Sequence, residues 1–358
     1  MTDLRRGLLS AGLALMVVAC SSTTPTPSTN PSSSQPTASG SQPTQRPGKT
    51  QRPGSTGGGG GPTSVPATPG ATPTATVPGT PIAGLDQLTG SDGRFTMLVL
   101  GSDARGHLSG ERTDTIMIVT IDPATGKVSM VSLPRDTENV PIAPGLAYGP
   151  KVTGLFQDYK LSHGANRTQQ FHDMVKAMEY AFGIEIDRYA LAHFTSVTHL
   201  IDNIGGIDVT LARKFVDTSG PTSHIVKGGL RLKAGVNHLD GIHTLAFCRS
   251  RDTTSDYDRA RRQQLTISVT IQKVLGMGID GIPALAQTVL GDGGIETNLQ
   301  LSDAATLYAL AQQSRLSNFK SVVLGPSQYA SGGGPPTYAT FMNVTAVRAL
   351  FSRIFGGH

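Results

Sequence analysis

The sequence of 358 residues has no tryptophan, only two cysteines and few aromatic residues, which make up 5% of it. It also has no apolar run of the ~20 residues needed to cross a bilayer, since the longest candidate, from Leu8 to Ala19, is too short. With Cys20 assigned to a lipid, as argued below, only Cys248 remains, so an internal disulfide is excluded. Stability must therefore come from core packing.

The first twenty residues are organised like a bacterial export signal. Arg5 and Arg6 precede the apolar run, and Val17-Val18-Ala19-Cys20 follows it. That ending resembles a bacterial lipobox, in which the cysteine is diacylated and becomes the mature N-terminus. We predict a lipoprotein signal peptide over residues 1–20, a lipid on Cys20 and an extracytoplasmic location at the outer face of the cell membrane. An ordinary cleaved signal peptide is the alternative.

Residues 21–82 consist almost wholly of Ser, Thr, Pro, Gly, Gln and Ala and include GGGGG at 57–61. Such a segment cannot seed a core, so we expect a disordered tether spanning about 45 Å or more. The remaining ~275 residues are enough for one large domain. We expect the catalytic domain over residues 83–318 and a C-terminal extension of it over residues 319–358.

The folded part carries little net charge. The formal charge of the chain is +5, of which the leader contributes +1 and the tether +3, so +1 remains for everything after the tether. A broad nucleic-acid footprint would need a strongly basic domain or aromatic residues interleaved with arginines. We therefore expect no nucleic-acid partner.

Three β-rich segments open the domain: RFTMLVLGSDARG, TIMIVTID and KVSMVSLPRDT. A Pro and Gly turn, DPATGK, joins the second to the third, which predicts an antiparallel meander. In a meander the end of the first strand, the start of the second and the end of the third share one sheet edge. Connectivity alone therefore predicts that Asp103, Asp114 and Arg135 converge.

Helical and extended patterns alternate in the rest of the chain. QQFHDMVKAMEYAFG has apolar residues at helical spacing, RYALAHF and IDVTL have the pattern of strands, and SVTHLIDNI and ISVTIQKVLG have that of helices. This alternation predicts an α/β fold with a mixed central β-sheet flanked by helices.

The stretch RSRDTTSDYDRARRQQ, residues 249–264, is rich in arginine and lacks lysine. We expect an extended backbone in FCRSR, which would put Arg249 and Arg251 on one side. A helix capped by Asp256 would carry further donors on one face and favour an anion at its N-terminus. Those donors are Arg259, Arg262 and Gln263. The alternative is a solvated helix start with local ion pairs.

Two carboxylates at a sheet edge, Asp103 and Asp114, suit a hard cation such as Mg²⁺, which takes oxygen ligands and keeps waters and phosphates in its shell. A guanidinium binds phosphate through paired hydrogen bonds. A metal site, several arginines and the start of a helix together predict a pyrophosphate-binding site. Turn and strand-cap roles for the two aspartates are the alternative.

The order of motifs is similar to that of the LytR-CpsA-Psr family of cell-wall glycopolymer ligases. The resemblance covers about residues 95–312 and rests on LVLGSDAR, RTDTIMIVTID, VSLPRDT, DYKLSHGA, IDNIGGIDV, LDGIHTLAFCRSR and DYDRARRQQ. It implies a LytR-CpsA-Psr-like single domain that moves a glycopolymer from a polyprenyl-pyrophosphate carrier to peptidoglycan, with Mg²⁺ at the pyrophosphate. Family members usually carry a transmembrane helix where this chain has the lipobox, and the 251–256 loop looks shorter than is common.

The resemblance also implies roles for residues. It implies Asp103 and Asp114 as metal ligands and the following pyrophosphate arginines as catalytic groups: Arg135, Arg249, Arg251 and Arg259. It implies substrate-binding positions at Arg112, Lys160, Asp256 and Gln263, to which the expected helix face adds Arg262.

The expected reaction is phosphotransfer, in which an acceptor sugar hydroxyl attacks the phosphorus of the glycopolymer and polyprenyl phosphate leaves. Asp136 and Asp256 are candidates for the general base, whereas His163 and His193 are expected to be structural. A polyprenyl-pyrophosphate hydrolase would use the same site with water as the nucleophile. A non-catalytic lipoprotein that binds polyprenyl phosphate or wall polymer is the alternative of another class.

Overall fold

The computed structural model describes residues 79–103, 110–164, 166–251, 254–278, 294–300, 302–314, 319–332 and 340–355. The predicted leader, Cys20 and nearly all of the predicted tether lie outside the described residues. No helix within the described ranges is long and apolar enough to span a bilayer.

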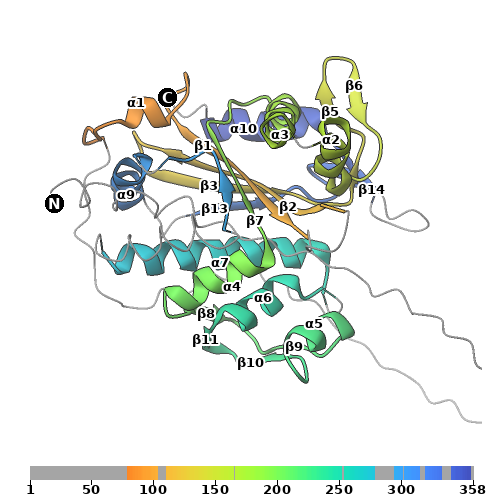
Figure 1. The fold of residues 1–358 in the computed structure, drawn as a ribbon, viewed down its shortest axis with the longest axis vertical. Helices are drawn as coiled ribbons and strands as arrows, with labels where there is room; N and C mark the ends of the chain where they lie inside the picture. The colour runs from red at the N-terminus through yellow and green to blue at the C-terminus, as the bar shows by residue number, and fades with distance from the viewer. Residues whose placement is uncertain are drawn as a thin grey trace, which may run out of the picture. The chain divides into compact units, whose positions relative to one another are not determined.

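A mixed six-stranded sheet forms the centre of the domain (Figure 1). Its strand order is β12-β7-β1-β2-β3-β13, with β1, β2 and β3 antiparallel and the pairs β1–β7 and β3–β13 parallel. The predicted meander and mixed sheet are thus confirmed. In sheet order the strands are β12 (Glu296–Thr297), β7 (Arg188–Ala192), β1 (Phe95–Ser102), β2 (Thr113–Asp122), β3 (Lys127–Leu133) and β13 (Lys320–Val323).

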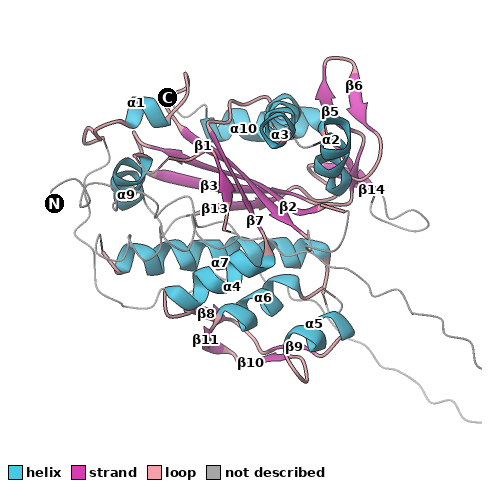
Figure 2. Ribbon diagram, viewed as in Figure 1, coloured by secondary structure: helices cyan, strands magenta, loops and turns pink. Residues whose placement is uncertain are grey.

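Helices cover both faces of this sheet (Figure 2). One face packs against α2 (Leu155–His163), α3 (Arg167–Phe182) and α10 (Val344–Phe355), and the other against α4 (Phe194–Asn203), α6 (Gly241–Arg249) and α7 (Asp256–Gly276).

Side chains of β1 alternate between two apolar cores. Val99 joins the core that holds Phe247 of α6 and Ile267 of α7, whereas Leu98 joins the core that holds Met178 of α3. Both faces of the strand are buried along its length. That explains why β1 is a continuous apolar run rather than an alternation of polar and apolar residues.

Shorter elements complete the fold. A small lobe consists of β8 (Ile207–Leu211), β9 (Phe215–Asp217), α5 (Gly220–Ile225), β10 (Leu230–Leu232) and β11 (Gly235–Leu239). The others are α1 (Leu85–Leu88), β4 (Thr137–Glu138), β5 (Val140–Ala143), β6 (Leu146–Tyr148), a 3₁₀ turn (Val152–Gly154), α9 (Asp303–Gln313), β14 (Ala330–Gly332) and β15 (Thr340–Met342).

The segment predicted as a C-terminal extension is integral to the domain. It supplies β13, an edge strand of the central sheet, and α10, whose Phe351 ring lies 5.2 Å from the Phe182 ring of α3. Cutting the chain near residue 318 would therefore expose apolar core on one face of the sheet.

Two local predictions in the arginine-rich stretch are wrong. Arg249 is the last residue of α6 and not part of an extended segment, because the apolar residues before it continue a buried helix. The N-cap of α7 is Ser255 and not Asp256: the Ser255 side chain accepts from the Asp258 amide, and the Asp258 carboxylate accepts from the Ser255 amide. The predicted helix itself is confirmed, and the Cys248 thiol is buried and donates to Thr266 Oγ1 at 3.2 Å.

Candidate functional site

The three sheet-edge residues predicted to converge do so. Asp103 follows β1, Asp114 lies near the start of β2 and Arg135 follows β3. Arg135 Nη1 donates to Asp114 Oδ2 at 2.7 Å, and the Arg112 amide donates to Asp103 Oδ1 at 2.8 Å. Thr153 Oγ1 donates to the other Asp114 oxygen at 3.0 Å. The strand ends are thus tied to one another through the two carboxylates.

These carboxylates fit a hard divalent cation. Asp103 is 8% exposed and Asp114 is 4% exposed, and both offer carboxylate oxygens at one edge of the sheet. Mg²⁺ is typically held by one or two protein carboxylates, with waters and substrate phosphates completing its shell. Burial opposes the charged form of Arg135, but the Asp114 carboxylate outweighs it and raises the pKa of this guanidinium above its ordinary value. Arg135 therefore stays cationic beside Asp114.

Arg259 links the first turn of α7 to the same sheet edge. Its side chain is 2% exposed, and its Nη2 lies 2.8 Å from Asp256 Oδ1 and 3.3 Å from the Asp114 carbonyl oxygen. Its Nε and Nη1, and Nε2 of Gln263 one turn further on, are buried and have no hydrogen-bond partner among the described residues. Buried donors without partners are rare in native proteins. An anion at this place would satisfy them.

Arg249 and Arg262 pack against aromatic rings. The guanidinium of Arg249 lies 4.3 Å from the centre of the Phe194 ring, which orients its flat donor face. Arg262 is 8% exposed, stacks on Phe215 and donates to the carbonyl oxygens of Phe247 and Ser250. These contacts hold the backbone from Phe247 to Ser250, and Ser250 separates the two predicted pyrophosphate arginines, Arg249 and Arg251. Substrate binding by Arg262 itself stays a prediction.

Lys160 belongs to a second cluster, which the sequence did not predict. Its Nζ lies 3.1 Å from Glu111 Oε2, and Glu111 directly precedes Arg112. Arg167, at the start of α3, makes paired hydrogen bonds of 2.6–2.7 Å to both Glu111 and Glu296. A cavity of about 320 Å³ lies between these groups, lined by Glu111, Lys160, Gly164, Arg167, Gln170 and Glu296.

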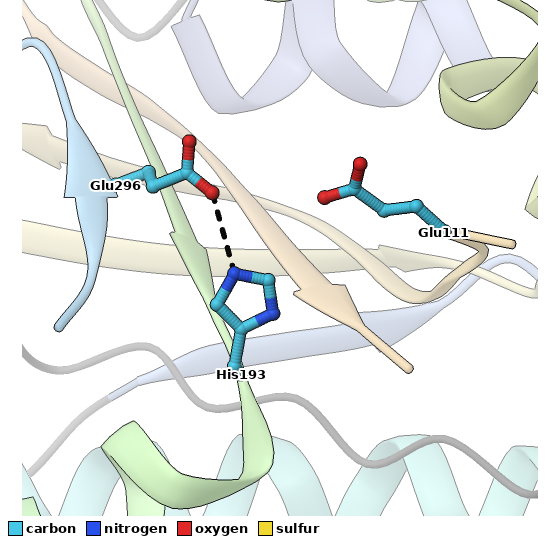
Figure 3. A group of neighbouring side chains, drawn as sticks. All are labelled: Glu111, His193 and Glu296. Carbon is cyan, nitrogen blue, oxygen red and sulfur yellow. Dashed lines mark hydrogen bonds and ion pairs between the residues drawn. The ribbon is translucent and has the colours of Figure 1, made fainter. Parts of the chain in front are cut away.

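Figure 3 shows the carboxylates of Glu111 and Glu296 on either side of one space, with the His193 ring between them at the end of β7. Their ligand atoms lie within 4.8 Å of one another, a spacing that suits a metal ion. Arg167, however, pairs with both carboxylates, and together with Lys160 it balances their two negative charges. Burial opposes ionisation of Glu296, but His193 and Arg167 outweigh it and lower its pKa to about 2. The cluster is therefore a charge-balanced ion-pair network.

The two histidines expected to be structural have carboxylate partners in the structure. His163 Nε2 lies 2.7 Å from Asp173 Oδ2, and His193 Nε2 lies 3.3 Å from Glu296 Oε1. Neither contact reaches the aspartates at the sheet edge. The two candidate bases are paired as well: Asp136 accepts from Lys151 Nζ at 3.0 Å, and Asp256 pairs with Arg259.

Two proteins with curated names are similar to this chain in sequence. TagT of Bacillus subtilis (strain 168), named polyisoprenyl-teichoic acid–peptidoglycan teichoic acid transferase, is 29% identical over 246 residues, which cover 67% of this chain and 70% of TagT. TagU of Bacillus cereus (strain AH820), with the corresponding name, is 28% identical over 180 residues, covering 50% of this chain and 52% of TagU. The chain thus spans about half the length of TagU.

Solved structures share the fold. B. subtilis TagV superposes with a TM-score of 0.54 at 22% identity, over 74% of this chain and 97% of TagV. TagT bound to LI-WTA superposes with a TM-score of 0.53 at 24% identity, over 74% of this chain and 90% of that one. The family model LytR_cpsA_psr matches residues 73–330, which is most of the chain. This protein is therefore a member of the LytR-CpsA-Psr family.

Proposed function

We propose that this protein transfers a glycopolymer from a polyprenyl-pyrophosphate carrier to peptidoglycan. The names of TagT and TagU describe a transfer of this class, from a polyisoprenyl carrier to peptidoglycan. The observation that carries the proposal is the convergence of two buried carboxylates, Asp103 and Asp114, with Arg135 and the unsatisfied donors of Arg259. Such a site suits a dianionic diphosphate next to a divalent cation.

The reaction forms one bond and breaks another. A hydroxyl oxygen of the acceptor sugar attacks the phosphorus attached to the glycopolymer, and the bond from that phosphorus to the bridging oxygen breaks. Polyprenyl phosphate leaves with the bridging oxygen, and the hydroxyl proton passes to a base. Catalysis of phosphoryl transfer consists mainly of positioning and charge stabilisation.

Arginines of this chain would supply most of that stabilisation. Arg259 lies in α7 and Arg135 follows β3. Arg249, the last residue of α6, and Arg251 flank Ser250. Preorganised donors in a buried site act on developing charge without reorganising. Mg²⁺, held by Asp103 and Asp114, would neutralise charge on the diphosphate oxygens when bound.

The remaining substrate contacts are proposed from motif positions. Arg112 lies beside Asp103 through their backbone bonds, and Lys160 lies at the mouth of the neighbouring cavity, 3.1 Å from Glu111. Gln263 and Asp256 frame Arg259 on α7. Asp136 and Asp256 stay candidates for the general base. Each carboxylate pairs with a cation, Lys151 or Arg259, and would lose that partner when the substrate phosphates bind the cation instead.

Lipid anchoring is part of the proposal and rests on the sequence. A diacylated Cys20 would hold the protein at the outer face of the cell membrane, where a lipid-linked donor and peptidoglycan are both within reach. The tether before the domain would set the distance from the bilayer at which the domain works.

The test is to incubate the purified protein with a short lipid-linked oligosaccharide, peptidoglycan and Mg²⁺, and to analyse the wall by mass spectrometry. Sugar phosphate linked to peptidoglycan supports transfer. Free sugar phosphate in solution would instead identify a polyprenyl-pyrophosphate hydrolase that uses the same residues. Unchanged lipid would leave only binding and would overturn the enzymatic proposal.

A further inference from the structure

The small lobe of β8, β9, α5, β10 and β11 carries a concentration of positive charge that the site does not use. Within residues 207–239 the sequence has five Lys and Arg residues but only two Asp residues, Asp208 and Asp217. Asp217 is fully buried and binds Ser219, Thr222 and Ser250, so it does not offset charge at the surface. The five cations are Arg213, Lys214, Lys227, Arg231 and Lys233.

All five cations are exposed, and none forms an ion pair with any residue that the structure describes. Two exposed cations elsewhere in the described ranges do have carboxylate neighbours: Lys176 pairs with Glu179, and Arg261 pairs with Asp258. The domain as a whole is nearly neutral, so this lobe is a local excess of positive charge. An excess of this kind attracts an anionic surface.

Apolar side chains lie among these charges on the β9–β10 ribbon. Val216 pairs directly with Arg231 across the two strands, so their side chains share one face. Their neighbours two positions away, Lys214 and Lys233, are also exposed. Val216 is 39% exposed, and Val236 on the adjacent β11 is 47% exposed. We call the set Lys214, Val216, Arg231 and Lys233 the basic face.

The basic face is held rigidly. The buried Asn237 side chain accepts from the Lys233 amide at 3.0 Å and donates to the Lys233 and Gly235 carbonyl oxygens. Figure 1 shows the lobe on the far side of α4 and α6 from the central sheet. It nevertheless adjoins the site, because Asp217 of β9 binds Ser250, between Arg249 and Arg251.

We propose that the basic face docks on the anionic headgroups of a lipid bilayer. Exposed valines between cations fit a bilayer interface, where apolar groups enter the headgroup region while cations meet lipid phosphate. A soluble polyanion would bind the cations but would make no contact that needs the exposed valines. The choice also rests on the proposed function, because a polyprenyl-linked diphosphate lies at headgroup level and the lobe beside its site must then lie there too.

An environment-sensitive dye placed on the face tests this contact directly. In the full chain with Cys20→Ser, a cysteine at Val216 carries the dye, while Cys248 stays unlabelled because it is 0% exposed. The emission should shift to the blue with phosphatidylglycerol vesicles and not with phosphatidylcholine vesicles. A dye at Lys176 on α3 is the matched control and should not shift. An unchanged Val216 dye, or equal shifts at both positions, would overturn the proposal.

Charge removal provides the second measurement. Neutralising Lys214, Arg231 and Lys233 together to glutamine should weaken binding to phosphatidylglycerol vesicles roughly 100-fold, at about 5-fold per cation. The matched control neutralises three exposed lysines on other surfaces, Lys127, Lys176 and Lys320, and should change binding less than 3-fold. Equal losses in the two triple variants would show unspecific attraction and contradict the proposal.

Two further readouts separate this proposal from its alternatives. Binding of soluble poly(glycerol phosphate) that the first triple variant loses, without vesicle binding, would assign the face to wall polymer and overturn the membrane contact. With a water-soluble short-chain donor, the same variant should keep wild-type transfer, since its three residues lie outside the site. Failure of transfer in the wild type would refute the proposed function, whereas the vesicle measurements would still test membrane binding on their own.

Discussion

Replacing Arg259 by lysine tests whether the buried guanidinium binds substrate or only completes an ion pair. Lysine keeps the positive charge and can keep the contact with Asp256, now 2.8 Å from Nη2. It removes the buried Nε and Nη1 donors, which have no hydrogen-bond partner within the described ranges. If those donors meet the diphosphate, transfer falls; if Arg259 serves only Asp256 and the Asp114 carbonyl, transfer is preserved.

The expected loss follows from the number of hydrogen bonds. A hydrogen bond to a charged group contributes about 1.5–3 kcal/mol. Loss of one such bond in the transition state slows transfer roughly 10-fold to 150-fold. Stability should change much less, because the bond from Nη2 to the Asp114 carbonyl, at 3.3 Å, is a single long one. Its loss costs about 1 kcal/mol, or roughly 2–4 °C in Tm for a domain of this size.

The matched control lies two residues further along the same helix. Arg261 is 65% exposed and pairs with Asp258 at 2.9 Å, so Arg261→Lys should change the rate less than 2-fold, because exposed ion pairs contribute little. Both variants are compared by initial rate of transfer at saturating Mg²⁺ and by thermal unfolding. A folded Arg259→Lys protein with the wild-type rate would refute the assignment of Arg259 to the diphosphate.

Four further substitutions test other parts of the account. Arg249→Lys loses the flat contact with Phe194 as well as paired donors and should slow transfer roughly 10-fold or more. A wild-type rate in this folded variant would mean that the arginine-rich stretch is only a charged surface. Asp114→Asn removes an anionic ligand at constant size and should lower Mg²⁺-dependent transfer roughly 100-fold or more while the circular dichroism spectrum is retained; full activity would end the metal assignment. Cys20→Ser should release the protein from membranes or leave its leader uncut, as measured by fractionation and mass; unchanged processing and membrane retention count against the lipobox. Asp187→Asn probes pH: burial, with help from Asp92 and Glu185, raises the pKa of Asp187 from 3.8 to about 6, so the folded state holds a proton that the unfolded state releases. The wild type should lose stability relative to this variant as the pH rises from about 4 to about 6, and the difference in stability should stay constant at higher pH. A difference in Tm that does not vary with pH would contradict the raised pKa of Asp187.

The sheet edge of the site was predictable because antiparallel connectivity leaves few choices. The short turn between β2 and β3 forces these two apolar strands into a hairpin, and antiparallel pairing of β1 with β2 then places the end of β1, the start of β2 and the end of β3 at one sheet edge. Asp103, Asp114 and Arg135 therefore had to meet, whatever the rest of the chain did. The structure confirms this with the 2.7 Å contact between Arg135 and Asp114.

The backbone conformation of the arginine-rich stretch was harder to predict from the sequence than the sheet edge. FCRSR is too short to show a period, and only packing of Phe247 and Cys248 into the core makes its first half helical. The cap of α7 was within reach of the sequence, since Ser255 stands three residues before Asp258 in the pattern of a capping box. Asp256 has the chemistry of a cap but lacks that partner.

Long-range ion pairs leave no local trace in a sequence. Arg167 binds Glu111 and Glu296, which lie 56 and 129 positions away, so no window of the chain contains the network. The basic face was predictable from the sequence in part. Its cations lie within twenty residues of one another in the sequence, but only the register of Arg231 opposite Val216 puts them on one face with that valine.

The central claim is that the bond cleaved lies between the two phosphates and that the sugar-linked phosphate moves to peptidoglycan. A lipid-linked oligosaccharide labelled with ³²P only at the phosphate next to the sugar tests it in one incubation with Mg²⁺ and peptidoglycan. We predict ³²P in the insoluble wall, where it stays when mild acid hydrolyses the bond between the phosphate and the transferred sugar, and we predict loss of this label with Asp114→Asn. Label that stays in the organic phase as polyprenyl pyrophosphate, or that appears only in water as free sugar phosphate, would contradict the claim.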